Sequence, residues 1–229
     1  MRLLLTSGGV TNATIRGMLV EMLGKPVEEC DALFIPTAQW GQPMCSPQTV
    51  WTSTAGRGPN QQGLVDLGWK SIGVLELTVL PSIAPNRWLP WVREADVLLV
   101  DGGEAMYLAH WMRQSGLADL LPSLTDIVWV GVSAGSMVMT PRIGRQFLEW
   151  NPHGSDDAMG VVNFSIFPHL DYPGWSSNTS ESARRWATDI GGPAYAIDDQ
   201  TAITVVDGTV RIVSEGNWHR FNHETERKP

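Results

Sequence analysis

The sequence predicts an α/β fold, in which helices cover both faces of a mostly parallel sheet and an antiparallel segment follows at the C-terminal end. Up to about residue 140, short apolar runs alternate with helical patterns, which is typical of βαβ units and a parallel sheet. After residue 190 the pattern changes to short strands, with Asp207-Gly208 as a tight hairpin turn. No stretch reads as a linker, so we expect residues 1–229 to form a single domain.

Each expected element follows from apolar periodicity and from its flanking Gly or Pro residues. The expected strands are Leu3–Thr6, Ala32–Ile35, Val74–Leu77, Ala95–Val100, Ile127–Val132, Val161–Phe167, Ala194–Ile197, Thr201–Val206 and Val210–Ser214. The expected helices are Asn12–Leu23, Arg87–Glu94, Ala105–Gln114 and Ser180–Ile190, with a further helix directly after Ser133. Gln39–Gln62 is rich in Gly, Pro, Gln and Ser and reads as a long loop, or as a loop that contains one weakly signalled helix.

Composition argues against several classes of function. A hydrophobic content of 43% with 17% charged residues is typical of a soluble globular protein, and a net charge of −8 argues against nucleic-acid binding. Two cysteines, Cys30 and Cys45, form neither a disulfide framework nor a zinc motif, and we expect no metal or other cofactor. No apolar run approaches the length of a membrane span, and the apolar start is too short for a signal peptide. These features predict a cytoplasmic protein without a membrane partner.

The segment Gly131-Val132-Ser133-Ala134-Gly135 has the Gly-x-Ser-x-Gly pattern of a nucleophile elbow, in which a strand delivers a serine into a tight turn before a helix. The simpler alternative is an ordinary strand-to-helix turn in which Ser133 only caps the helix. In a parallel sheet, the strand ends at Gly8, Pro36, Gly102 and Gly131 share one edge, where the active sites of such folds lie. We therefore expect the elbow and the Gly102-Gly103 loop to be neighbours.

A serine nucleophile needs a base, and His169 is the best placed of the five histidines. It follows an apolar strand directly, after Pro168, at the edge where we expect Ser133. The alternative is a histidine that merely ends a strand and bonds to local backbone groups. The other histidines lie in a helix, in a turn and in a polar C-terminal stretch: His110, His153, His219 and His223.

Three motifs follow one another along the chain: Asp101-Gly102-Gly103-Glu104-Ala105-Met106-Tyr107-Leu108, Gly131-Val132-Ser133-Ala134-Gly135 and Phe167-Pro168-His169. In this order they resemble peptidase family S51, which includes peptidase E (aspartyl dipeptidase) and, more distantly, cyanophycinase. The first two strand ends and the C-terminal segments Ala196–Ile203 and Ser214–Trp218 are also similar to this family, so the resemblance runs nearly end to end. It implies the fold of class I glutamine amidotransferases, with serine in place of their cysteine.

The resemblance also implies roles for individual residues. Ser133 would be the nucleophile and His169 the general base, while the backbone N–H groups of Gly103 and Ala134 would form the oxyanion hole. For the acid of the triad, alignment with the family favours Glu149. Asp171 is the alternative, because it repeats the His-x-acid spacing of class I amidotransferases.

The substrate-binding residues depart from the family pattern. Gly102-Gly103-Glu104-Ala105 stands where the family has Gly-Gly-Asn-Thr, so that Glu104 could repel an acidic substrate or bind an amino terminus. Arg184 and Arg185 lie one turn beyond the position of the arginine that peptidase E uses near its substrate carboxylate, and a solvated helix face is the alternative for both. Trp40 and Trp51 could narrow the pocket.

Together these features predict a serine-type peptidase that hydrolyses small peptides, with Asp-X dipeptides as one candidate substrate and a homodimer as one candidate assembly. The alternatives are a catalytically silent binding protein with the same fold, and an esterase or amidase that acts on a non-peptide acyl substrate. The altered Glu104-Ala105 pair motivates the first alternative, and the shared chemistry of all acyl transfers motivates the second.

Overall fold

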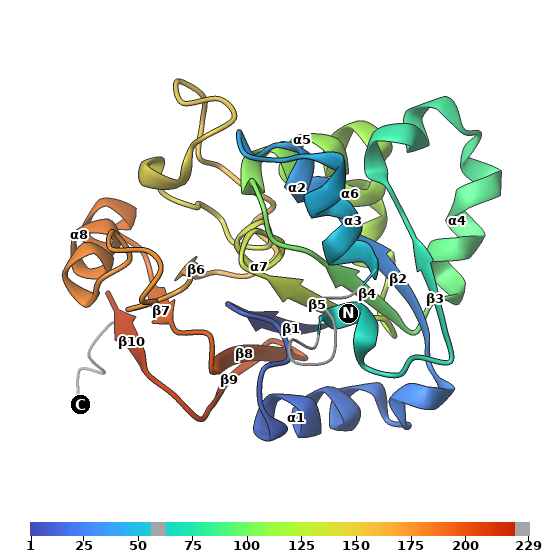
Figure 1. The fold of residues 1–229 in the computed structure, drawn as a ribbon, viewed down its shortest axis with the longest axis horizontal. Helices are drawn as coiled ribbons and strands as arrows, with labels where there is room; N and C mark the ends of the chain where they lie inside the picture. The colour runs from blue at the N-terminus through green and yellow to red at the C-terminus, as the bar shows by residue number, and fades with distance from the viewer. Residues whose placement is uncertain (56–62, 223–229) are drawn as a thin grey trace.

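The computed structural model describes residues 1–55 and 63–222, and its main body is a seven-stranded sheet (Figure 1). The strand order is β3-β2-β4-β5-β1-β8-β9. These strands are β1 (Arg2–Thr6), β2 (Asp31–Ile35), β3 (Ser71–Val74), β4 (Val97–Val100), β5 (Val128–Val132), β8 (Thr201–Val206) and β9 (Thr209–Ser214). The expected α/β class with a mostly parallel sheet is confirmed.

Parallel pairing places the carboxyl ends of five strands at one edge of this sheet. β1 pairs with β5, β5 with β4, β4 with β2 and β2 with β3, all in parallel. β8 joins β1 in the antiparallel direction, and β9 joins β8 in the same way through the turn at Asp207-Gly208. Consequently the start of β8 lies beside the end of β1, where Thr6 pairs with Ala202.

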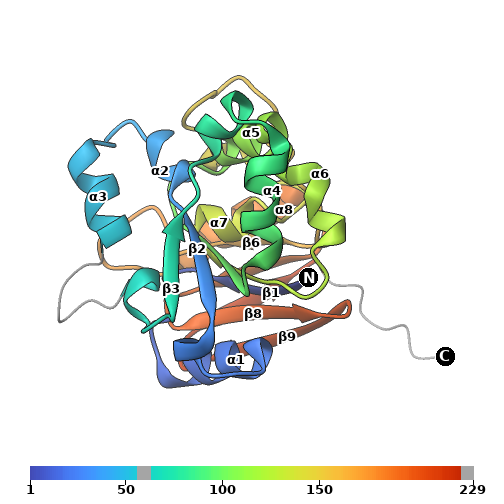
Figure 2. The same ribbon diagram turned by 90° about the vertical axis from the view of Figure 1, so that its right-hand side faces the viewer.

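Helices cover both faces of the sheet, as Figures 1 and 2 show. Successive residues of β1 alternate between the two layers of the core: Leu3 and Leu5 pack on one side and Leu4 on the other. Helix α1 (Ala13–Leu23) covers the side of Leu4 and is stopped by Gly24 in the left-handed conformation. The other side carries α4 (Pro85–Glu94), α5 (Ala105–Ser115), α6 (Leu117–Leu120) and α7 (Ala134–Met137).

A second, three-stranded sheet lies beside the first and carries helix α8 (Ser180–Ile190) (Figure 1). Its strands are β6 (Ser165–Phe167), β7 (Ala194–Ile197) and β10 (Trp218–Phe221), in the order β10-β7-β6. Trp186 of α8 is buried against Phe167 of β6, with ring centroids 5.6 Å apart. The chain passes directly from this sheet to the main one through residues 198–200, between β7 and β8.

Several expected elements differ from those observed. β3 ends at Val74, and Leu75 and Leu77 are buried outside a strand, so Val74–Leu77 was wrong as a strand. The strand expected at Val161–Phe167 is limited to β6. For Gln39–Gln62 the second of the two expected alternatives, a loop that contains a helix, agrees with the described part: α3 (Pro47–Ala55) lies within it, and the short α2 (Thr37–Trp40) ends at its start. Residues 56–62 and His223 lie outside the described residues.

No helix within residues 1–55 and 63–222 combines the length and the apolar character that crossing a bilayer requires.

Candidate active site

Ser133 occupies a sharp turn between β5 and α7. Its φ is +48° and its ψ is −108°, a conformation that side chains rarely adopt and that strand-to-helix elbows impose. Its backbone N–H donates to Thr6 O at 3.0 Å, which fixes the turn to the end of β1. Strain of this kind persists only where the surrounding structure enforces it, and it often accompanies function.

Steric constraints explain why the first and last positions of the motif are glycine. A Cβ at Gly131 would lie 2.4 Å from Gly135 O, and a Cβ at Gly135 would lie 2.2 Å from Val100 O. Neither position therefore accepts a side chain unless the backbone moves. The close packing seats α7 directly against the ends of β4 and β5.

The loop after β4 runs beside the elbow, as the sequence predicts. A Cβ at Gly102 would be 3.5 Å from Ser133 Cβ, which places this loop in contact with the candidate nucleophile. Gly103 has φ +140°, and a Cβ there would meet the carbonyl of Ala38 at 2.3 Å. Glycine is therefore needed for the backbone to pass between Ala38 and the elbow.

Asp101 anchors α2 and α3 to this loop. Its buried carboxylate accepts hydrogen bonds from Gln39 Nε2 at 2.6 Å, from the Ser53 hydroxyl and from the N–H of Gly102 at 2.8 Å. The wall formed by residues 37–55 is thus tied to the end of β4. Its tryptophans, however, do not contribute as expected: Trp40 donates to Glu76 and Trp51 is 70% exposed.

His169 lies after β6 and its ring contacts a carboxylate. Nδ1 of His169 is 2.7 Å from Oδ1 of Asp199, and the histidine backbone has φ +54°. Burial of Asp199 opposes its ionisation, but the hydrogen bond and charge of His169 and the hydroxyl of Ser7 lower its pKa below the ordinary value. The paired carboxylate fixes which ring nitrogen faces away from Asp199, namely Nε2.

This contact differs from the expectation for the acid. The carboxylate of Asp171 is engaged at the start of α8, where it accepts from the N–H and the hydroxyl of Ser180 at 2.9 and 2.8 Å. Glu149 lines the same cavity as His169, but the structure pairs the imidazole with Asp199. Asp199 was missed because it lies in the turn between β7 and β8, far from the elbow in sequence. The feature of the sequence that could have indicated Asp199 is its position just after the apolar strand Ala194–Ile197.

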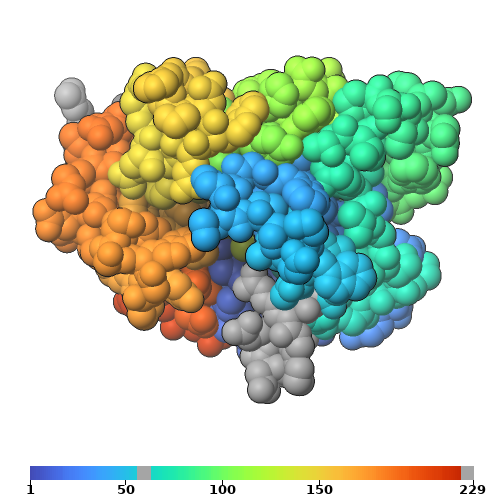
Figure 3. Space-filling view, turned by 45° about the horizontal axis from the view of Figure 1, so that its top comes forward, coloured from blue at the N-terminus to red at the C-terminus, as the bar shows by residue number. Residues whose placement is uncertain are grey.

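Ser133 and His169 line one cavity of about 450 Å³. In Figure 3 the surface is hollowed where the blue segment of α2 and α3, the yellow segment near residue 150 and the orange segment near residue 175 meet. Trp175 stands against the histidine, with ring centroids 4.4 Å apart at 82°. Trp175 and Phe147 are therefore aromatic residues of the cavity lining, and the sequence singled out neither.

Glu104 lines the cavity but is held by the backbone. Its carboxylate caps α5 by accepting from the N–H of Tyr107, and it also accepts from the N–H groups of Glu149 and Trp150 at 3.4 and 3.5 Å. The side chain is only 2% exposed. Burial raises the pKa of Glu104, and these backbone hydrogen bonds oppose that effect.

Of the two adjacent arginines, Arg185 lines the cavity whereas Arg184 is not among the residues that line it. Arg185 also pairs with Glu181 one turn earlier in α8, at 2.8 Å. Both side chains of this pair are mostly exposed, so the pair is weak and the guanidinium can exchange partners. Among the described residues, the lining therefore includes Arg185 together with the acidic residues Glu104 and Glu149.

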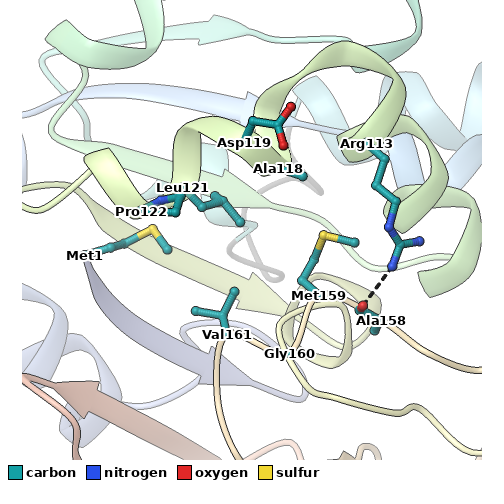
Figure 4. A pocket seen from close by; sticks show the side chains of 10 residues that line it. All are labelled: Met1, Arg113, Ala118, Asp119, Leu121, Pro122, Ala158, Met159, Gly160 and Val161. Atoms are coloured by element: carbon teal, nitrogen blue, oxygen red, sulfur yellow. Dashed lines mark hydrogen bonds between the residues drawn. The ribbon is translucent and has the colours of Figure 1, made fainter.

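A larger hollow of about 700 Å³ lies elsewhere, at the start of β1, and Figure 4 shows its lining. Most of the residues that line it are apolar, as are Met1 and Met159. Arg113 also lines it and donates to the carbonyl of Ala158 at 2.8 Å. Among the described residues its lining includes neither a serine nor a histidine, so size alone does not identify the site and the chemistry favours the smaller cavity.

Comparisons with known proteins address the family and the fold. The model of "Peptidase family S51" matches residues 3–213. A candidate peptidase E from Listeria monocytogenes EGD-e superposes with a TM-score of 0.66 at 18% identity, covering 94% of this chain and 98% of the other. A peptidase from an acI-B1 Actinobacterium gives 0.64 at 20% identity, covering 95% and 89%. At these identities the two structures support the fold alone, and no curated protein matches.

The family model spans nearly the whole chain, including the elbow, the Gly102-Gly103 loop and His169. The chain therefore belongs to peptidase family S51 and is a serine peptidase.

Proposed function

We propose that Ser133, His169 and Asp199 form the catalytic triad of a peptidase that acts on small peptides. The observation that carries the proposal is the 2.7 Å contact between His169 Nδ1 and Asp199 Oδ1, on a histidine that shares a cavity with Ser133. Because Nδ1 is occupied by Asp199, Nε2 is the nitrogen that serves the serine. Catalytic contacts of this kind commonly tighten when substrate binds.

In the proposed reaction, Oγ of Ser133 attacks the scissile carbonyl carbon while His169 Nε2 accepts the hydroxyl proton. The resulting oxyanion is stabilised by the backbone N–H groups of Gly103 and Ala134. Ala134 is the first residue of α7, where N–H groups have no partner within the helix. His169 then protonates the leaving amine. Water attacks the acyl-enzyme and gives a proton to His169, which passes it to Oγ of Ser133 as the bond from Oγ to the acyl carbon breaks and the acid product leaves.

The cavity supports a short peptide as the substrate. Its volume of about 450 Å³ suits a small ligand rather than a folded chain. Its charged lining groups can bind opposite charges on a small peptide, because Glu149 can pair with an ammonium terminus and Arg185 with a carboxylate. We extend the proposal to Asp-X dipeptides, in which Arg185 would bind the carboxylate of the acidic side chain rather than the terminal carboxylate.

Two measurements test the nucleophile. Wild type and Ser133→Ala are compared on dipeptides that include Asp-Leu and Asp-Ala, and we expect the variant to lose turnover. A fluorophosphonate probe should label the wild type at Ser133 only. Absence of both turnover and labelling would favour a silent binding protein, whereas labelling with turnover of esters but no peptides would favour an esterase or amidase.

The adjacent arginines provide a matched pair for the substrate. We expect Arg185→Ala to raise KM for Asp-Leu by about tenfold, the loss of one charged contact at a partly exposed site. KM for a neutral dipeptide should change less. Arg184→Ala removes the same charge from the same helix outside the cavity lining and should leave both values unchanged. Equal effects of the two substitutions would refute a specific role for Arg185.

The predicted homodimer remains a prediction, and light scattering coupled to size-exclusion chromatography would test it.

A further inference from the structure

The hydroxyl of Ser7 touches both His169 and Asp199. Ser7 follows β1 directly, and its side chain is completely buried. Its Oγ donates to Asp199 Oδ1 at 2.8 Å and accepts from the backbone N–H of His169 at 2.6 Å. With the contact between His169 Nδ1 and Asp199 Oδ1, these bonds close a ring of three residues.

The directions of these bonds are fixed by chemistry. The N–H of His169 can only donate, so the Ser7 oxygen must accept there. The hydroxyl proton is then free for the carboxylate of Asp199, which as an ion can only accept. One hydroxyl therefore orients a backbone group of the histidine and a side-chain group of the acid at the same time.

The segment after β1 also holds the backbone of the Asp199 turn. Thr11 Oγ1 donates to Asp199 O at 2.5 Å, and Asn12 Nδ2 donates to Gln200 O at 3.0 Å. Gly8 lies so close that a Cβ there would be 2.8 Å from Asp199 Cβ. The carboxylate is thus seated by contacts from residues 7–12, and Ser7 supplies the contact to the charged group itself.

His169 needs such support because its backbone is in an unfavourable region. With φ +54°, it occupies a left-handed conformation that costs free energy for a residue with a Cβ. Its N–H is bonded by Ser7 across 162 residues of sequence rather than by a neighbouring turn. The position of the imidazole relative to the elbow therefore depends on the end of β1.

We propose that Ser7 is a positioning residue of this peptidase, whose hydroxyl sets the mutual orientation of His169 and Asp199 so that Nε2 faces Ser133. The inference rests on the proposed triad. Ser7 is not among the residues that line the cavity, so it acts through His169 and Asp199 and not on the substrate.

Loss of the hydroxyl has a specific electrostatic consequence. Burial opposes ionisation of Asp199, while His169 and the Ser7 hydroxyl lower its pKa. Without Ser7 the carboxylate becomes more basic and stabilises the protonated imidazole more strongly. Among the described residues, the other titratable or charged groups around His169 are Asp171 and Tyr172, which follow it in the chain, and Glu104, Glu149 and Arg185 on the cavity walls. Ser7→Ala leaves all of them in place.

The test compares Ser7→Ala and Ser7→Cys with wild type on a dipeptide that the wild type cleaves. We expect kcat to fall by about tenfold to a hundredfold, as for a small misplacement of catalytic groups, with KM within about twofold. The acidic limb of the kcat/KM profile should move to higher pH. Cysteine fills the volume of serine but is a weak donor, so it should retain the defect. Recovery of wild-type kcat in Ser7→Cys would show that volume rather than the hydrogen bond matters.

Ser115→Ala is the matched control. Ser115 is also a buried serine whose hydroxyl both donates and accepts, to Met112 O and from the N–H of Leu117, each at 3.3 Å. It lies at the C-terminal end of α5, outside the cavity lining. We expect a lower unfolding temperature but unchanged kcat and an unchanged pH profile. An identical pH shift in this control would overturn the inference.

The triad and the positioning role of Ser7 can be refuted separately. If wild type and Ser133→Ala cleave the dipeptide equally, the triad itself is wrong. If Ser133→Ala is inactive while both Ser7 variants keep the wild-type kcat and pH profile, only the role of Ser7 is wrong. Should Ser7→Ala fail to fold, the isosteric Ser7→Cys provides the same measurement.

Discussion

Substitution of Asp199 by asparagine should nearly abolish catalysis while leaving the fold in place. Asparagine has the size of aspartate but no charge, and its amide can present N–H₂ to His169 Nδ1, which favours the wrong tautomer. The carboxylate contacts the ring at 2.7 Å, and the side chains of His169 and Asp199 are 12% and 27% exposed. For charges centred about 4 Å apart at an effective dielectric constant of about 20, the lost attraction to the imidazolium is about 4 kcal/mol. That energy corresponds to about a thousandfold in kcat.

The assay measures both peptide turnover and the rate at which a fluorophosphonate labels Ser133, because the second value does not depend on the choice of substrate. Both rates should fall by about the same factor in Asp199→Asn. Asp171→Asn is the matched control, since that carboxylate is engaged with Ser180 and should affect turnover little. A variant Asp199→Asn that keeps more than a tenth of the wild-type rates, or a variant Asp171→Asn that loses as much as Asp199→Asn, would rule out the proposed role of Asp199.

Four further substitutions test stability. Gly135→Ala should lower the free energy of unfolding by about 3 kcal/mol, because its Cβ would lie 2.2 Å from a carbonyl oxygen of β4. Gly17→Ala, at an open position in α1, should instead raise it by about 1 kcal/mol in the same urea titration. The raised pKa of Glu104 means that the folded protein retains a proton that the unfolded chain releases, so this group makes stability fall as pH rises above about 4.5. Glu104→Gln should remove that part of the pH dependence, which unfolding curves between pH 4 and 7 would detect; an unchanged slope would contradict it. Asp156→Asn should cost about 2 kcal/mol in thermal unfolding, because this buried carboxylate bonds Arg142 and the N–H of Gly144, each at 3.0 Å.

Much of the fold followed from the sequence where local pattern and tertiary burial agree. Ser180–Ile190, Ala194–Ile197 and Thr201–Val206 have the expected bounds, and the parallel core strands follow their apolar runs. The pattern failed where apolar residues are buried without being extended. Leu75 and Leu77 are at most 2% exposed, but they belong to the connection after β3. Their apolar side chains are buried without an extended backbone, so the apolar run was wrongly predicted to be a strand.

For other elements the local sequence pattern was too weak to predict a helix or a strand. α2 and α3 depend on tertiary contacts such as the bond from Gln39 to Asp101, which no sequence period reveals. β10 has polar and aromatic residues and pairs with β7 from 20 or more positions away, and no strand was expected there.

In the candidate site, too, some neighbours could be predicted from the sequence and others could not. Ser133 and the Gly102-Gly103 loop stand next to each other, as strand order in a parallel sheet requires. The partner of His169 could not be predicted in the same way, because it depends on which strand lies beside β1. The placement of β8 at that position, which brings Asp199 to the end of β1, is a property of topology and not of local sequence.

The three proposed catalytic side chains belong to different parts of the framework. Ser133 follows β5 of the main sheet, His169 follows β6 of the small sheet, and Asp199 lies in the three-residue connection between the two sheets. The site therefore lies between the two sheets, and its geometry depends on how firmly the small sheet packs against the main one. A fluctuation that loosens β6 and β7 would separate the catalytic side chains while the seven-stranded sheet stays intact. Inactivation by heat should accordingly precede the loss of main-sheet structure, so that activity reports the docking of one layer rather than the stability of the whole.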